Sequence, residues 1–133
     1  MNKRVENILE SIKEALVDIY GVEAEILYSI KIVRCSQADR DHRREERIHA
    51  HVGCMDRTIC ISNSIDLLDD CNITGLLLHE IGHLIHLEEL LDIEIPEDIG
   101  DDEIIADMII DNIFGIHIYY DKKKIQWVIN TSS

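Results

Sequence analysis

The sequence predicts an α+β fold with a small, twisted, mostly antiparallel sheet and three or more helices. Apolar residues recur every three or four positions over residues 3–20, as in an amphipathic helix that Gly21 ends. Short runs rich in β-branched residues follow, as expected of strands. Two later apolar segments, 75–91 and 103–114, have the length of helices and are separated by an acidic linker containing Pro96.

Length and charge restrict the class of protein. The 133 residues, 46% hydrophobic, suit one domain spanning residues 1–133. A net charge of −14 argues against a phosphate-binding surface, and hence against nucleic acid as the main partner. Charges spread through the first twenty residues predict neither a signal peptide nor a membrane span. We therefore expect a cytoplasmic protein whose partner is a basic or neutral protein or peptide, with no membrane partner.

The remaining segments are assigned from their patterning. Residues 22–33 partly alternate and predict a strand with one buried face. Residues 37–47 lack large apolar side chains and predict a solvated loop or strand end. Two β-like runs, 48–53 and 58–62, predict a hairpin. Residues 117–130 fit a strand or a helix equally well.

Capping residues set the expected limits of the two later helices. Asn72 or Thr74 can cap the first helix, whose apolar run ends at Leu91. The second helix spans 103–114, with Asp101 or Asp102 as its N-cap and Gly115 as its end.

The first of these helices carries an HExxH motif, His79-Glu80-Ile81-Gly82-His83. Residues four apart share one helix face, so His79 and His83 can hold one metal ion, with Glu80 beside it. The flanking residues are apolar almost all round the helix, which indicates that it is buried. Buried His and Glu side chains need polar partners, and a metal ion supplies them. The motif therefore predicts one Zn²⁺ ion.

A catalytic zinc site takes three protein ligands, so one more is needed. His86 lies farther along the same straight helix and is carried away from the metal by its rise. Glu103 opens the next helix after enough chain for a turn, and small Ala106 allows the two helices to approach closely. Asp107 follows one turn after Glu103 and can orient a ligand histidine. The alternative is that Glu103 and Asp107 belong to a solvated acidic face.

His79 and His83 bind the metal on one face of the helix, and Glu80 cannot reach it on that face. It is better placed to act as a general base that takes a proton from a zinc-activated water, which then attacks a carbonyl carbon. Gly82, in the middle of the helix, costs about 1 kcal/mol relative to Ala and predicts a closely packed neighbour.

With HEIGH at 79–83 and EIIAD at 103–107, the chain resembles the zinc metallopeptidases called gluzincins, in particular minimal gluzincins and ImmA/IrrE-type peptidases. The resemblance implies a zincin-like domain in which the HExxH helix packs against a glutamate-bearing helix. It implies zinc bound by His79, His83 and Glu103, with Glu80 as general base and Asp107 behind the ligands. It also implies that the strand within 58–65 binds extended substrate by edge pairing.

One feature of such peptidases is missing. They usually add a Tyr or His that stabilises the oxyanion, and between Leu84 and Asp102 only His86 offers one. His117, Tyr119 and Tyr120 are candidates without a motif. The leading hypothesis is a zinc metallopeptidase. The alternatives are a catalytically weak zincin-fold binding or regulatory module acting through its acidic surface, and a zinc hydrolase of a non-peptide amide.

Two lesser patterns remain. His49 and His51 stand two apart on an expected strand and form either a second metal pair or, as we favour, a surface pair. The cysteines Cys35, Cys54, Cys60 and Cys71 include no close ligand pair, which predicts reduced thiols rather than a zinc knot.

Overall fold

The computed structural model describes residues 3–34, 50–52, 55–95, 98, 100–121 and 126–130, with side chains as far as residue 118. The elements in chain order are α1 (Arg4–Tyr20), the 3₁₀ helix η1 (Val22–Ser29), β1 (Lys31–Arg34), β2 (Ala50–Val52), β3 (Thr58–Ile61), the 3₁₀ helix η3 (Asn63–Leu67), α3 (Asp70–Leu87), α4 (Asp102–Phe114), β4 (His117–Asp121) and β5 (Gln126–Asn130). This is a small α+β arrangement, as predicted.

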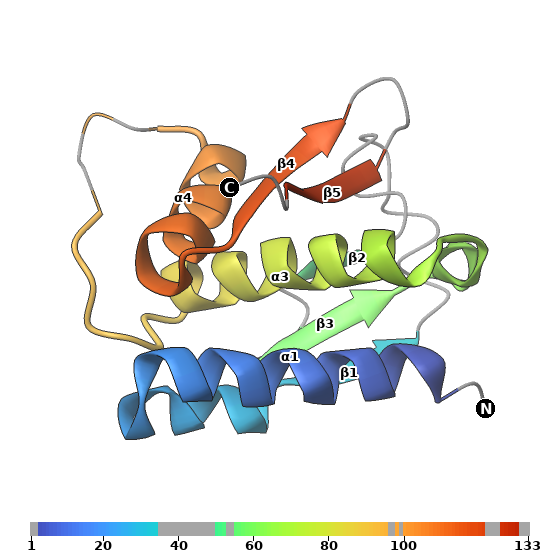
Figure 1. The fold of residues 1–133 in the computed structure, drawn as a ribbon, viewed down its shortest axis with the longest axis horizontal. Helices are drawn as coiled ribbons and strands as arrows, with labels where there is room; N and C mark the ends of the chain where they lie inside the picture. Colours follow the sequence, from blue (N-terminus) through green and yellow to red (C-terminus); the bar gives the residue numbers. More distant parts are fainter. Residues whose placement is uncertain are drawn as a thin grey trace.

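Helix α3 runs through the middle of the molecule (Figure 1). It contacts α1, α4, and strands β2, β4 and β5, so other elements cover most of its surface. Its residues from Leu76 to Ile85 are all buried, which explains the nearly continuous apolar sequence. The predicted packing of α3 against α4 is confirmed, and α3 is the element around which the hydrophobic core is assembled.

The larger sheet has three strands in the order β1-β3-β2, with β1 parallel and β2 antiparallel to β3. The antiparallel β2–β3 pair confirms the predicted hairpin. Strands β4 and β5 form a separate antiparallel pair, which decides the tail in favour of strands. Because β3 is hydrogen-bonded on both sides, the expectation that the strand before α3 binds substrate by edge pairing is wrong; β1 and β2 are the outer strands of the described sheet.

The strand expected over residues 22–33 is wrong for most of its length. Residues 22–29 form η1, and only Lys31–Arg34 is extended. The buried side chains here are Ala24, Leu27 and Ile30, which are three residues apart. That spacing is the repeat of a 3₁₀ helix, and over a short stretch it resembles the alternation of a strand.

Helix α3 begins and ends earlier than the sequence suggested. Asp69 is its N-cap and accepts a hydrogen bond from the Asn72 N–H at 2.8 Å, while the Thr74 hydroxyl donates to the Asp70 carbonyl. At the other end, Leu87 is the last helical residue, not Leu91. The capping role expected of Asn72 or Thr74 therefore falls to Asp69.

The early end of α3 coincides with a contact to a distant part of the chain. The carboxylate of Glu88, the C-cap, accepts hydrogen bonds from the Arg57 N–H at 2.8 and 3.1 Å, and Arg57 has a left-handed backbone with φ of 47°. The next residue, Glu89, also has positive φ, at 51°. Glu88 thus ties the end of α3 to the turn between β2 and β3, a contact between residues 31 apart that no sequence pattern signalled.

Helix α4 matches its prediction closely. The Asp101 side chain accepts a hydrogen bond from the Glu103 N–H at 2.9 Å and caps the helix. Gly115 ends it with φ of 70°, in the left-handed conformation that glycine adopts without strain.

Some expectations concern other parts of the chain. Residues 37–47 lie outside the described residues. Cys60 is disulfide-bonded and Cys71 is free and exposed, so the prediction of reduced thiols is wrong for Cys60 and right for Cys71.

Within the described residues, the length and hydropathy of the helices are insufficient for any of them to cross a membrane.

Candidate metal centre

Three side chains from two packed helices converge at one point. His79 and His83 lie one turn apart on α3, and Glu103 lies in the first turn of α4. The Glu103 carboxylate is 2.7 Å from Nε2 of His79 and 3.2 Å from Nε2 of His83. The predicted turn of the chain back to the HExxH helix is therefore confirmed, and Glu103 does not belong to a solvated acidic face.

This group has the dimensions of a metal site. One ligand atom from each of His79, His83 and Glu103 can be chosen so that all lie within 4.8 Å of one another. In a tetrahedral zinc site with bonds of about 2.0 to 2.1 Å, ligand atoms are about 3.4 Å apart. Two imidazoles and one carboxylate are also a ligand set of catalytic zinc. This buried cluster could hold a metal ion, and a small adjustment of side chains would bring it to that geometry.

The cluster is buried on the α3 side and partly exposed on the α4 side. His79 has no exposed surface, and His83 is 7% exposed. The Glu103 and Asp107 side chains are each 24% exposed. The carboxylates therefore form the partly exposed side of the cluster, whereas the histidines are held in place by the core.

Asp107 lies directly behind one ligand. Its Oδ1 is 2.7 Å from Nδ1 of His79, while Nε2 of the same ring faces Glu103. This is the arrangement in which a carboxylate fixes the tautomer and orientation of a metal-binding imidazole. The spacing of one turn between Glu103 and Asp107 predicted that both would face α3, and the distances confirm that placement.

The charges around His79 affect its protonation. Burial lowers its pKa, but the hydrogen bonds to Asp107 and Glu103 and the charge of Glu80 outweigh this effect and raise the pKa to about 9. Burial opposes ionisation of Glu103, yet its contacts with both histidines lower its pKa well below the usual range. Burial also raises the pKa of Asp107. Protein groups alone therefore favour a proton on His79 at neutral pH.

Between about pH 6.5 and 9, we expect the stability of the metal-free protein to fall as pH rises, whereas the stability of a zinc-loaded protein should stay nearly constant. A raised pKa means that protonated His79 stabilises the metal-free fold fully below about pH 6.5, and that this stabilisation is lost as pH rises through about 9. Zinc must displace that proton, so its affinity should rise about tenfold per pH unit over the same range. Thermal unfolding between pH 6 and 9.5, with zinc and with a chelator, measures both slopes. Parallel slopes would contradict this reading of His79.

Glu80 lies beside the cluster without joining it. It is 3% exposed, and its charge contributes to the raised pKa of His79. Among the described residues, the group that can share a metal contains His79, His83 and Glu103 but not Glu80. This separation is what the HExxH spacing predicted for a residue that handles protons rather than binding metal.

Close contact between the two helices makes the convergence possible. A Cβ placed on Gly82 would lie 2.9 Å from the carbonyl carbon and 3.1 Å from Cα of Ala106, and closer still to the Ala106 oxygen. Real Cβ atoms do not tolerate such contacts with backbone. The glycine in the motif therefore allows α4 to approach α3 closely enough for Glu103 to reach both histidines.

The other histidine candidates lie apart from this cluster. His86 is half-buried, and its Nδ1 has no hydrogen-bond partner in the described part of the chain. His117 is exposed and its Nδ1 lies 3.5 Å from Asp111. His51, opposite Cys60, is on the other face of the sheet from Ile59 and Ile61, which line the core. His49 and the side chains of Tyr119 and Tyr120 are outside what the structure describes.

Comparison of the chain with protein-family models, with curated proteins and with solved structures found no match.

Proposed function

We propose that the protein is a gluzincin-type zinc metallopeptidase with a zincin-like fold, acting in the cytoplasm on a protein or peptide. The observation that carries the proposal is the buried group of His79, His83 and Glu103, backed by Asp107 and flanked by Glu80. A structural zinc site usually has four protein ligands, whereas three ligands with a neighbouring carboxylate are the composition of a hydrolytic site.

Each residue has a distinct role in this proposal. His79, His83 and Glu103 would hold the metal, and Asp107 would keep the His79 ring in its binding orientation. Zinc, when bound, lowers the pKa of a coordinated water and polarises a substrate carbonyl. Glu80 accepts the proton and later returns it to the leaving amine. Because Glu80 is buried, bulk water does not readily compete for that proton.

The edge of β2 is the proposed place for an extended substrate. β2 is an outer strand of the described sheet and contacts α3, so it offers an edge on which an extended peptide could add as a further strand. The edge of β2 takes the substrate-binding role that was expected of β3, because β3 is paired on both sides.

The second candidate is a zincin-fold binding or regulatory module that holds a metal without efficient catalysis. One observation favours it. His117, a candidate for oxyanion stabilisation, is exposed and lies beside Asp111 rather than with the metal cluster. Such a module would act through the acidic surface implied by the net charge of −14.

Metal analysis combined with a peptide-cleavage assay separates the two candidates. We expect the protein purified without added zinc to contain one equivalent of metal and to cleave members of a peptide library. A chelator should abolish the cleavage, and zinc should restore it. Metal binding without cleavage would favour the module, and no specific metal binding would remove both proposals.

Asp107→Asn should weaken zinc binding by roughly 10- to 100-fold without unfolding the protein. Asparagine keeps the size of the side chain but is a poorer acceptor for the His79 N–H that the 2.7 Å contact implies. Zinc affinity can be measured by competition with a chelator. The control is Asp111→Asn, one turn further along α4 at an exposed position, which should change affinity little. Equal affinities in the two variants would contradict the role of Asp107.

A further inference from the structure

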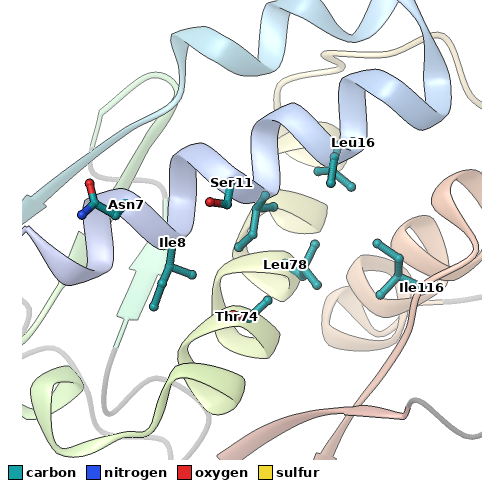
Figure 2. Close-up of a pocket in the computed structure, with 9 residues that line it drawn as sticks. Asn7, Ile8, Ser11, Leu16, Thr74, Leu78 and Ile116 are labelled. Atoms are coloured by element: carbon teal, nitrogen blue, oxygen red, sulfur yellow. The ribbon is translucent and has the colours of Figure 1, made fainter.

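A groove lies on another face of α3. It is an open groove of about 420 Å³ between α1 and α3, and Ile116, just before β4, closes one side (Figure 2). Helix α1 contributes side chains at positions 7, 8, 11, 12, 15 and 16, and α3 contributes Thr74 and Leu78. Leu78 precedes His79 by one residue, so the groove and the metal cluster occupy different faces of the same helix.

The lining suits apolar side chains. Six of the nine described residues that line it are apolar, and none of the nine is charged. Ile12, Leu16 and Leu78 are buried at its base, while Ile8 and Ile116 are only half-buried. Ile8 on α1 and Ile116 before β4 therefore leave apolar surface at the groove that the core does not cover.

The groove has the length of about two and a half helical turns. From Asn7 to Leu16, α1 rises by about 14 Å, and apolar side chains at positions i, i+4 and i+7 of another helix span about 10 Å. Ile19, one turn beyond Ala15, is 51% exposed and extends the row of apolar side chains that α1 presents to the groove. This spacing matches the way in which an amphipathic helix lays its apolar side chains into a hydrophobic groove.

The charges on α1 beside the groove indicate which charges a helix bound in the groove would carry on its polar face. Glu14 and Asp18 are exposed on α1, each three residues after a groove residue, Ser11 and Ala15, whereas Arg4, one turn before Ile8, is paired with Asp70. Lys13 is buried away from the groove, where it binds Glu10 and backbone carbonyls. It therefore does not neutralise Glu14 or Asp18. A second copy of this chain would bring a further charge of −14 to this surface, which opposes self-association.

We propose that this groove binds a basic amphipathic helical segment of another protein. The apolar side chains of that segment occupy the space between Ile8, Ala15 and Leu78. Its lysine or arginine residues lie near Glu14 and Asp18. The inference does not depend on the proposed hydrolytic function, because the groove shares no side chain with the metal cluster.

Selection of peptides from a random library tests this proposal. The library needs about 16 residues, enough for four helical turns. Peptides selected on the wild-type protein are expected to carry apolar residues at i, i+4 and i+7 and a positive net charge. Their affinity should fall at least tenfold in Ala15→Trp and in Ser11→Trp, which fill the groove from two exposed positions.

Glu6→Trp is the matched control, because Glu6 is exposed on α1 outside the groove lining. It should bind the selected peptides within twofold of wild type. The proposal would be overturned by equal binding to all variants, by selected peptides of negative charge or without helical spacing, or by the recovery of no binding peptide. Sedimentation showing a wild-type dimer that Ala15→Trp dissociates would also overturn it, in favour of a second copy in the groove.

Discussion

Replacing Glu80 by glutamine is expected to lower peptide hydrolysis by roughly 10²- to 10⁴-fold while leaving zinc affinity nearly unchanged. Glutamine is almost isosteric with glutamate but cannot accept the proton, and Glu80 is not one of the three grouped ligand residues. The two quantities are measured separately, as initial rates on a cleaved peptide and as competition with a chelator. An active Glu80→Gln variant would contradict the role of this residue while leaving the metal site intact.

His83→Ala provides the contrasting case. It removes one of three grouped ligands, so zinc should be lost, and hydrolysis and metal-dependent stability should be lost with it. If both variants lost zinc to the same extent, Glu80 would be a ligand rather than a base. If neither lost zinc, the metal would be bound elsewhere, and the proposed function would fail with the site.

The candidate site was predictable because its signals are local. The spacing of His79 and His83 fixes their common face, and the spacing of Glu103 and Asp107 does the same on the next helix. One chain reversal between the two helices then brings the four side chains together. The distances of 2.7 Å from His79 to both Glu103 and Asp107 follow from these two periodicities and the close approach at Gly82.

The parts of the fold that were mispredicted depend on contacts distant in sequence or on short repeats. Burial every third residue in η1 looked like partial alternation because eight residues do not distinguish the two periods. The pairing of β3 with β1, which removes its free edge, joins segments 27 residues apart, as from Lys31 to Thr58. The end of α3 is set by Glu88 binding the Arg57 N–H. No local pattern in the sequence encodes these contacts.

Gly82→Ala is expected to lower both the stability of the fold and the affinity for zinc. Its Cβ would lie 2.9 Å from the Ala106 carbonyl carbon and would force α4 away from α3. Overpacking against backbone costs about 3 kcal/mol, and the higher helix propensity of alanine offsets about 1 kcal/mol, which leaves a net loss of about 2 kcal/mol. Displacing Glu103 from the histidines by about 1 Å should also weaken zinc binding and lower hydrolysis by about 100-fold.

Denaturant unfolding and chelator competition measure these effects, and two further variants locate their cause. Gly100→Ala adds the same methyl group where nothing lies within 4 Å, so its stability should stay within about 0.5 kcal/mol of wild type. Adding Ala106→Gly to Gly82→Ala should not restore stability, because the clash is with the backbone of residue 106 and not with its side chain. Rescue by this second change, or a stable Gly82→Ala variant with normal zinc affinity, would show that the helices can separate without cost to the site.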